Sequence, residues 1–204
     1  MKKIAILGAS GHGKVVADIA KKNGYDSIVF LDDDETVISC GAYPVIGKTK
    51  EASDFECDVI VAIGNAKIRQ RMQEELLHSG TRVVSLVHPN AVIAEDVEIG
   101  IGTVVMAGAV INSGARIGDG VIINTSSSVD HDCMIGNYVH ISVGAHVAGT
   151  VEIGSHTWIG AGAVVSNNIT ICGDCMVGAG AVVVKDIKES GTYVGVPAKR
   201  VDNR

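Results

Sequence analysis

Branched aliphatic residues recur at every sixth position through the second half of the chain. The series begins at Val87 and ends at Val183, and each of its 17 members is isoleucine or valine. The position two residues before each member is mostly small, as at Ala109 and Cys133, and the position after it is often Gly, Asn, Asp or Ser. Such self-similarity at a fixed period is typical of repeat architectures.

The six-residue period predicts a left-handed parallel β-helix. Each branched aliphatic residue would fill the interior of a triangular prism, the small residue would fit beside it, and the turn-forming residue would round the corner. Three hexapeptides make one coil of 18 residues, and successive coils stack by parallel strand pairing. The period is unbroken from residue 87 to residue 183, so we expect no long loop to interrupt the prism.

The first half of the chain has a different pattern. Buried-strand patterns are followed by segments of helical spacing; the strands are expected at residues 3–7, 27–31 and 59–63, and the helices at residues 14–22 and 66–79. Alternation of strands and helices with short loops predicts a small parallel sheet of Rossmann-like type. The fold class is therefore a small α/β Rossmann-like domain followed by a left-handed parallel β-helix. We place the first domain at residues 1–82, the β-helix at 83–186 and a C-terminal tail at 187–204.

A glycine loop joins the first strand to the first helix. Free N–H groups and the helix dipole favour a phosphate at such a helix N-terminus. The loop reads G-x-x-G-x-G, however, with Ser10 where the second glycine of the dinucleotide fingerprint would stand, so a plain tight turn is the alternative. Asp32 and Asp33 end the next strand, where an acid commonly meets a ribose or a base; a solvated acidic turn is the alternative there.

Composition narrows the possible functions. The formal net charge of −6 argues against nucleic acid or an anionic membrane as the main partner. We find no apolar run long enough to span a membrane and no signal peptide, and five cysteines, an odd number, read as free thiols in a reducing cytoplasm. Cys172 and Cys175 have C-x-x-C spacing, but a zinc site needs four ligands and no second pair matches, so we expect packing and no metal. Cys133 falls in the small inward column, which disfavours a nucleophilic role.

The stretch VDHDCMIGNYVH, residues 129–140, carries the candidate chemistry of the prism. His131 lies two residues past an interior aliphatic residue, so its side chain is expected to point outward. Gly149 is one coil above it, and the Gly149 N–H could stabilise an oxyanion. Asp132 can reach the imidazole only if the corner is irregular, because adjacent strand residues point to opposite faces. A solvent-exposed histidine without a role is the alternative. His140 is also expected to point outward, with Trp158 one coil above.

Seven segments together carry a resemblance to one family; they are GASGHG at 8–13, LDD at 31–33, AIGN at 62–65, NTSS at 124–127, HDC at 131–133, HISVGA at 140–145 and GVPAKR at 195–200. In these the chain resembles, over nearly its whole length, the bacterial PglD-type sugar acetyltransferases of the hexapeptide-repeat superfamily.

The resemblance implies a homotrimer with acetyl-CoA in the groove between adjacent prisms. His131 matches the general base, and Asp132 stands where the family typically has a glutamate. His140, Ala161 and Ala179 match contacts to acetyl-CoA. A further set of residues in the first domain matches the family's contacts to the nucleotide sugar. The set comprises Ser10, Gly11, His12, Asp32, Asp33 and Gly64. We also place the basic Lys199 and Arg200 near the phosphate end of the coenzyme.

The activity implied is acetyl-CoA-dependent N-acetylation of a UDP-linked 4-amino-4,6-dideoxy-N-acetyl sugar, as in UDP-N-acetylbacillosamine synthesis, by direct transfer. Alternatives within the family are O-acetylation of a sialic-type sugar and N-acetylation of a GDP-linked amino sugar such as perosamine. A different class of function is a non-catalytic trimer that binds nucleotide sugars.

Overall fold

The computed structural model describes residues 1–201, so the last three residues of the expected tail lie outside the described part. The chain divides into two compact units, Met1–Pro89 and Asn90–Arg204. The first unit therefore ends seven residues later than residue 82. In it, Val59 N–H donates to Arg82 O and Val84 N–H donates to Val59 O, which continues the pairing along the sheet. Asn23 Nδ2 then donates to Val87 O at 2.9 Å and holds the end of this segment.

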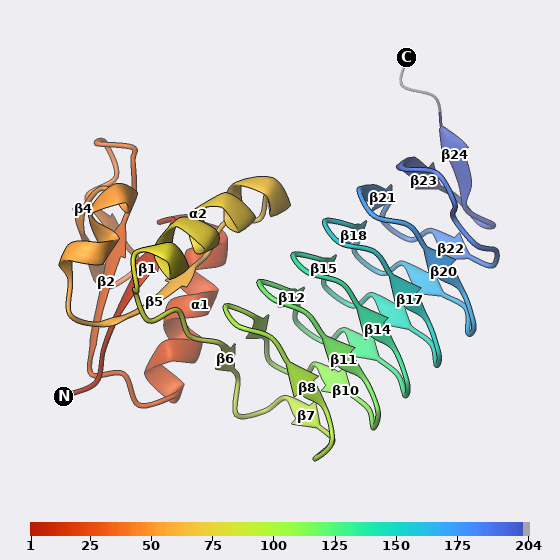
Figure 1. Cartoon of the computed structure of the whole chain (residues 1–204), viewed down its shortest axis with the longest axis horizontal. Coiled ribbons are helices and arrows are strands. Elements are labelled where there is room, and N and C mark those ends of the chain that lie inside the picture. The colour runs from red at the N-terminus through yellow and green to blue at the C-terminus, as the bar shows by residue number, and fades with distance from the viewer. Residues whose placement is uncertain (202–204) are drawn as a thin grey trace. The chain divides into compact units, whose positions relative to one another are not determined.

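The first unit is a five-stranded sheet with two α-helices (Figure 1). The sheet order is β3-β4-β2-β1-β5, and β1 pairs in parallel with both β2 and β5. The elements are β1 Lys3–Leu7, α1 Gly11–Lys22, β2 Ser27–Leu31, β3 Ser39–Cys40, β4 Tyr43–Gly47, the 3₁₀ helix η1 Thr49–Asp54, β5 Asp58–Val61, α2 Ala66–His78 and β6 Leu86–Val87. The parallel strands and both helices were predicted, whereas the β3–β4 hairpin and η1 were not.

The second unit is a stack of triangular coils built almost entirely from two-residue strands (Figure 1). Its three sheets are parallel except for the last strand of one of them, and they follow the period of 18, so that Ile111 pairs with Val129 and Ile117 with Ile135. We call them by one member each: the β16 sheet (β22-β19-β16-β13-β10-β7), the β14 sheet (β20-β17-β14-β11-β8) and the β15 sheet, whose members in this unit are β24-β23-β21-β18-β15-β12-β9.

Their strands have the following bounds: β7 Val92–Ile93, β8 Glu98–Ile99, β9 Val104–Val105, β10 Val110–Ile111, β11 Arg116–Ile117, β12 Ile122–Ile123, β13 Ser128–Val129, β14 Met134–Ile135, β15 His140–Ile141, β16 His146–Val147, β17 Glu152–Ile153, β18 Trp158–Ile159, β19 Val164–Val165, β20 Thr170–Ile171, β21 Cys175–Val177, β22 Val182–Val183, β23 Gly191–Val194 and β24 Lys199–Val201.

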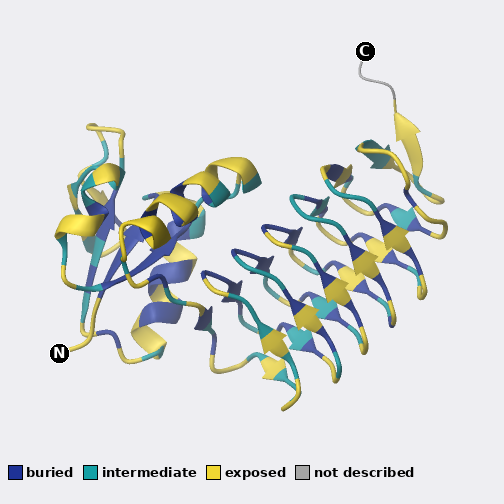
Figure 2. Ribbon diagram, in the orientation of Figure 1, coloured by how far each residue is buried: buried dark blue, intermediate teal, exposed yellow. Residues whose placement is uncertain are grey.

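The interior of the prism is filled as the repeat predicts. Every member of the aliphatic series from Val105 to Val183 is buried, and the small residues two positions earlier are buried with them. Buried and exposed segments consequently alternate along each coil (Figure 2). Thr103 and Thr157 belong to the small column, and their hydroxyls donate to the carbonyls of Gly118 and Cys172. Small polar side chains are thus tolerated inside because they find hydrogen-bond partners.

The corners turn at a different position from the one predicted. Left-handed backbone recurs every sixth residue from Gly102 to Gly180, three residues after each interior aliphatic residue and not directly after it. The residue directly after it instead remains in the ladder, as Asn112 N–H does by donating to Val129 O. Seven of these left-handed positions are not glycine; they are Ser126, Asp132, Tyr138, Thr150, His156, Asn168 and Asp174.

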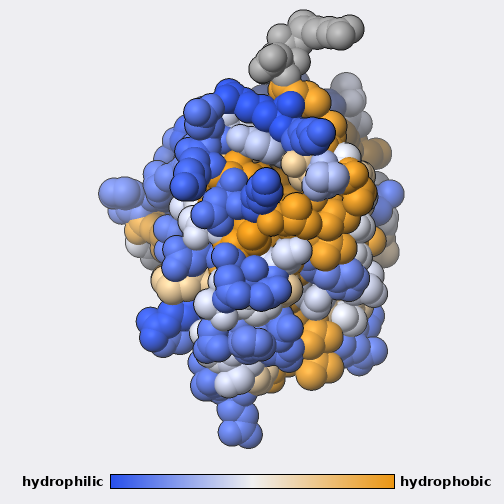
Figure 3. All heavy atoms as spheres, turned by 90° about the vertical axis from the view of Figure 1, so that its right-hand side faces the viewer, coloured by the Kyte–Doolittle hydropathy of each residue, from blue (hydrophilic) through white to orange (hydrophobic). Residues whose placement is uncertain are grey.

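Most of the expected C-terminal tail continues the β15 sheet. Strand β23 pairs in parallel with β21, and β24 folds back antiparallel on β23. Apolar surface gathers at this end of the prism (Figure 3). The exposed apolar side chains of the last coil and the terminal hairpin are Met176, Val184, Val194, Val196 and Val201.

Candidate active site

His131 occupies a corner of the prism between β13 and β14. Its side chain is 58% exposed, as expected for an outward position. Asp132 follows in the left-handed conformation, with a φ of 57°. The left-handed turn is the regular corner of this prism, and it brings both side chains to the same side of the backbone. Asp132 Oδ2 consequently lies 2.9 Å from His131 Nδ1.

Two carboxylates shape the electrostatics of this corner. The hydrogen bond to Asp132 raises the pKa of His131 above its ordinary value, and the charge of Asp130 adds to the effect. Asp130 Oδ1 accepts from Asn112 Nδ2 at 2.7 Å and from the His131 N–H at 2.8 Å. The first of these bonds lowers the pKa of Asp130, so this carboxylate stays ionised. When Asp132 accepts from Nδ1–H, the Nε2 atom keeps its lone pair and can act as a base.

Gly149 lies against the imidazole, one coil above His131. A β-carbon at Gly149 would be 2.4 Å from His131 Nε2, so only glycine leaves room for the ring in this position. The register is fixed on both sides, since Thr150 N–H donates to His131 O at 2.9 Å and Asn168 N–H donates to Gly149 O at 3.1 Å. The predicted proximity of Gly149 and His131 is confirmed, while the oxyanion role of the Gly149 N–H stays a prediction.

His140 lies on β15 and is buried, with only 8% exposure, although it is outward on its strand. Trp158 on the next coil covers it, and the two ring centroids are 4.6 Å apart. His140 Nε2 hydrogen bonds with Asn124 Nδ2 at 3.0 Å, and Trp158 Nε1 donates to Ser142 Oγ at 2.6 Å. The stacking with Trp158 follows from the period of 18. Asn124 and Ser142 were not singled out from the sequence, because a contact across 16 residues does not follow that period.

Ala161 and Ala179 stack on one corner, where β18 and β21 lead into β19 and β22. Both are exposed, and Gly180 N–H donates to Ala161 O at 2.8 Å. This corner bounds one edge of the β16 sheet, whereas the corner of His131 and Gly149 bounds its other edge. Within one chain the candidate base and these two candidate coenzyme contacts therefore lie on opposite edges of the same sheet.

The glycine loop of the first unit meets the acidic end of β2. Because β1, β2 and β5 are parallel neighbours, their carboxyl ends share one edge of the sheet. Asp32 Oδ2 accepts from Ala9 N–H at 2.7 Å, and Asp32 Oδ1 accepts from Asp34 N–H at 3.0 Å. A β-carbon at Gly13 would be 2.2 Å from Gly8 O, so the loop needs glycine at residue 13 for this close approach.

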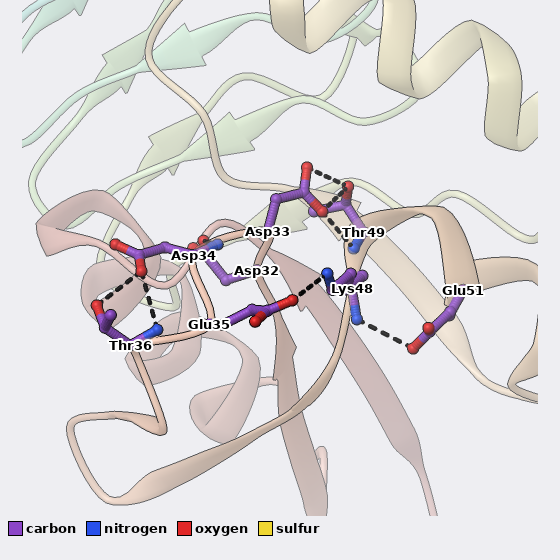
Figure 4. Close-up of polar contacts among 8 residues, drawn as sticks. All are labelled: Asp32, Asp33, Asp34, Glu35, Thr36, Lys48, Thr49 and Glu51. Atoms are coloured by element: carbon purple, nitrogen blue, oxygen red, sulfur yellow. Dashed lines mark hydrogen bonds and ion pairs between the residues drawn. The ribbon is translucent and has the colours of Figure 1, made fainter.

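Asp33 and its neighbours form a polar cluster next to this loop (Figure 4). Asp33 accepts from the Thr49 N–H and hydroxyl, and Lys48 forms an ion pair with Glu35. The carboxylates of Asp32 and Asp33 thus bind within the chain. Their expected contact with a ribose or base stays a prediction, to be made through oxygen lone pairs that remain.

His12 begins α1 together with Gly11, and Ser10 precedes them as the N-cap. Burial and, to a smaller extent, the positive charge of Arg69 lower the pKa of His12 to about 4, so the imidazole is neutral at pH 7. Arg69 itself is buried, and its Nη1 donates to the carbonyls of Ile63 and Gly64 at 2.8 and 2.9 Å. Arg69 was missed from the sequence, since nothing in its helical spacing marks a buried cation.

The cysteines and basic tail residues take the following places. Cys175 is buried and Cys172 half-buried, in line with the packing interpretation, and Cys133 Sγ lies inward and donates to Ala148 O.

Among residues 1–201 no cluster of three or more His, Cys, Asp or Glu is arranged to hold a metal ion. No helix in this range is both long and apolar enough to cross a membrane. Arg200 forms an ion pair with Glu189, and the predicted coenzyme contact of Lys199 and Arg200 stays a prediction.

Comparison with known proteins finds relatives of this chain. Residues 3–76 match the PglD N-terminal domain family. The UDP-N-acetylbacillosamine N-acetyltransferase of Bacillus subtilis (strain 168) is 34% identical over 113 residues, which are 52% of this chain and 52% of that protein. The aligned part thus spans about half the length of the curated relatives that the chain matches.

Two solved structures align over nearly the whole chain. The acetyltransferase domain of PglB from Neisseria gonorrhoeae FA1090, in complex with acetyl coenzyme A, is 44% identical with a TM-score of 0.95, over 98% of this chain and 99% of that one. PerB from Caulobacter crescentus, in complex with CoA and GDP-perosamine, is 36% identical with a TM-score of 0.93, over 99% and 98%. The chain belongs to the PglD-type family of acetyl-CoA-dependent sugar acetyltransferases with hexapeptide repeats.

Proposed function

We propose that this chain transfers the acetyl group of acetyl-CoA to the amino group of a nucleotide-linked amino sugar. The acceptor is a UDP-linked 4-amino-4,6-dideoxy-N-acetyl sugar of the bacillosamine type. The observation that carries the proposal is the His131–Asp132 pair, set against Gly149 on the outside of the prism. It places an imidazole base on an open surface, which is what deprotonation of an attacking amine requires.

His131 Nε2 takes the proton of the sugar amine as that nitrogen attacks the thioester carbonyl. Asp132 accepts from Nδ1–H, which keeps the imidazole in the tautomer whose Nε2 is a base and stabilises the cation that forms. The Gly149 N–H stabilises the oxyanion of the tetrahedral intermediate. Collapse of this intermediate releases CoA thiolate, and the proton held by His131 is available to it.

His140, Ala161 and Ala179 contact acetyl-CoA in this proposal. The Trp158 ring and Asn124 fix the imidazole of His140, so that it offers a rigid wall to the acyl-pantetheine arm. Ala161 and Ala179 leave an exposed corner with small side chains, along which a long thin ligand can lie.

Active sites between subunits of a homotrimer are part of the proposal. The two candidate sets of residues lie on opposite edges of the β16 sheet, so one chain does not bring them together. A second prism laid against this sheet would bring its own corner next to His131.

We assign binding of the acceptor, the nucleotide-linked sugar, to the first unit. Ser10, Gly11 and His12 would hold the phosphates through the N–H groups at the start of α1, where the helix dipole favours anions. Neutral His12 can donate or accept a hydrogen bond without adding charge. Asp32, Asp33 and Gly64 would contact the nucleoside.

A GDP-linked amino sugar is the second candidate acceptor. It is favoured by PerB, whose structure contains GDP-perosamine, and by the GDP-perosamine N-acetyltransferase of Escherichia coli O157:H7, which is 31% identical over 113 residues.

The test is acetyl-CoA-dependent thiol release with the UDP-linked sugar and GDP-perosamine as parallel acceptors. Changing His131→Ala should lower turnover about 10²-fold or more and leave acetyl-CoA affinity nearly unchanged. His78→Ala removes another exposed histidine, one that bonds Glu74 O on α2, and should keep wild-type turnover. Undiminished turnover in His131→Ala would reject the base, and binding without thiol release for either sugar or for sialic acid would favour a non-catalytic function.

A further inference from the structure

Two thiols meet at the corner between β20 and β21. Cys172 follows β20, Cys175 begins β21, and their Sγ atoms are 3.5 Å apart. Cys133, Cys40 and Cys57 are also free, but none of them contacts another sulfur in the described range. Packing accounts for the burial of these two residues, and the contact between their sulfurs is a further feature of the corner.

The backbone holds both cysteines in place from the coil below. Cys172 O accepts from Thr157 Oγ1 at 3.1 Å, and the same hydroxyl accepts from Cys175 N–H at 3.3 Å. Between them Asp174 takes the left-handed conformation, with a φ of 57°, and its N–H donates to Ser155 O at 2.9 Å. One threonine therefore clamps both ends of the turn, and the two side chains face each other across it.

The two sulfurs of this pair are in contact but are not covalently bonded. A disulfide needs a sulfur–sulfur distance of about 2.0 Å, so the two Sγ atoms must approach by roughly 1.5 Å. Cys133, by contrast, points its Sγ at Ala148 O in the prism interior.

The two thiols differ in access. Cys172 is half-buried and lines a groove of about 520 Å³ on the β14 sheet, together with Gly154, Thr170 and Ile171. Cys175 is buried, and this burial raises its pKa to about 12, with a further contribution from the hydrogen bond with Cys172. Cys172 is accordingly the sulfur that a reagent meets first.

We propose that Cys172 and Cys175 form a reversible dithiol–disulfide site that is oxidised by small-molecule disulfides of the glutathione class. Cys172 thiolate attacks one sulfur of the oxidant, forms a mixed disulfide and expels one thiol. Cys175 then loses its proton as it attacks the Cys172 sulfur and expels the second thiol. The two cysteines lose two electrons and two protons, and the oxidant is reduced to two thiols.

The site is independent of the acetyl transfer proposed above. It lies at the last full coil, where Cys175 pairs with Gly191 of β23 and its Sγ is 3.8 Å from Glu189 O. The terminal hairpin of β23 and β24 thus pairs directly with β21, the strand that the disulfide would cross-link.

The experiment uses the full chain equilibrated in glutathione redox buffers and, separately, with the strong thiol oxidant diamide. After acid quenching the protein is unfolded in guanidinium chloride at alkaline pH with excess iodoacetamide, so that buried thiols also react as thiolates, and the intact mass is measured. The expected result is a fall from five alkylated thiols to three, with a loss of two mass units, reversed by dithiothreitol. Peptide mapping should locate the bond between residues 172 and 175.

Three variants make the outcome decisive. Cys57→Ser removes a thiol of similar half-buried position and should still form the disulfide. Cys172→Ser should form none, and Cys175→Ser should stop at a mixed disulfide with glutathione. Circular dichroism checks that each variant is folded. Five free thiols in wild type after diamide treatment, or a bond formed equally well in Cys172→Ser, would overturn the proposal.

Discussion

His131 is held by contacts that leave one nitrogen available. Asp132 binds Nδ1, Asp130 holds the backbone N–H, and Gly149 supports the ring beside Nε2. Each contact has a different structural origin. Asp132 lies on a left-handed turn, Asp130 projects from the strand ladder, and Gly149 lacks a β-carbon. The arrangement specifies the orientation of the ring more tightly than an exposed position would by itself.

Asp132 sets the pH dependence of the proposed base. The hydrogen bond raises the pKa of His131 above about 6.5, so the basic form gains population only at higher pH, and activity should rise through that raised pKa. In Asp132→Asn the Nδ1 partner is kept but the negative charge is lost. The acidic limb of kcat/KM against pH should therefore move to lower pH. Glu75→Gln removes the same charge from α2 and should leave the limb in place; equal shifts in both variants would contradict the assignment.

A side chain at Gly149 should act through the His131 ring, because Gly149→Ala keeps the backbone N–H that is proposed to stabilise the oxyanion. In Gly149→Ala the new methyl group would displace Nε2, and turnover should fall roughly 10-fold or more, because a displaced base loses its geometry. The same change made in His131→Ala meets no ring and should cost little further activity. Thiol release by the two single variants and the double variant measures this. Equal losses in both backgrounds would show that Gly149 acts independently of His131.

The sequence predicted the strands of the prism better than the contacts made at its turns. The interior columns were predictable because burial repeats with the covalent period, and the pairings His140–Trp158 and His131–Gly149 follow directly from 18 residues per coil. The contact between Asp132 and His131 was not predictable, because it depends on a left-handed φ at residue 132 that the presence of Asp in the sequence does not indicate. The Asn124–His140 bond was also not predicted, because it spans 16 residues and not 18, although it recurs one coil above as the Ser142–Trp158 bond. Strand β3 lies outside the repeat altogether.

Left-handed corners make a specific prediction about stability. Thr150 adopts a φ of 59°, which costs a β-branched residue roughly 1–2 kcal/mol that glycine avoids. Glycine also loses more backbone entropy on folding, about 0.5–1 kcal/mol. Thr150→Gly should consequently raise the free energy of unfolding by about 0.5 kcal/mol. Thr170→Gly, at an exposed position inside strand β20, should lower it. Urea unfolding of both variants tests this, and destabilisation by Thr150→Gly equal to that by Thr170→Gly would refute the strain.

The whole molecule combines an α/β unit that was predicted from its strand and helix patterns with a prism whose proposed active site would need neighbouring subunits. Opposite edges of the β16 sheet carry the candidate base and the candidate coenzyme contacts. A single prism cannot close such a site across a flat sheet, so assembly would complete the enzyme. This is the physical reason why the sequence predicts residues at the site better than it predicts the site itself.

Subunit mixing tests whether each site is shared. His131→Ala and Ala179→Trp should each be inactive alone, since one lacks the base and the other fills the corner where acetyl-CoA would lie. If two subunits build each site, an equal mixture of exchanged trimers should regain activity in about a quarter of its sites, because each of two positions is correct half the time.

The double variant His131→Ala/Ala179→Trp mixed equally with wild type gives the counterpart. About a quarter of the sites should then be active if they are shared and about half if each chain builds its own. Native mass spectrometry verifies exchange among 21.1 kDa chains. An inactive mixture of the single variants together with half-activity in the second mixture would place base and coenzyme on one chain. A quarter in both would establish that each subunit supplies the base for acetyl-CoA bound along its neighbour.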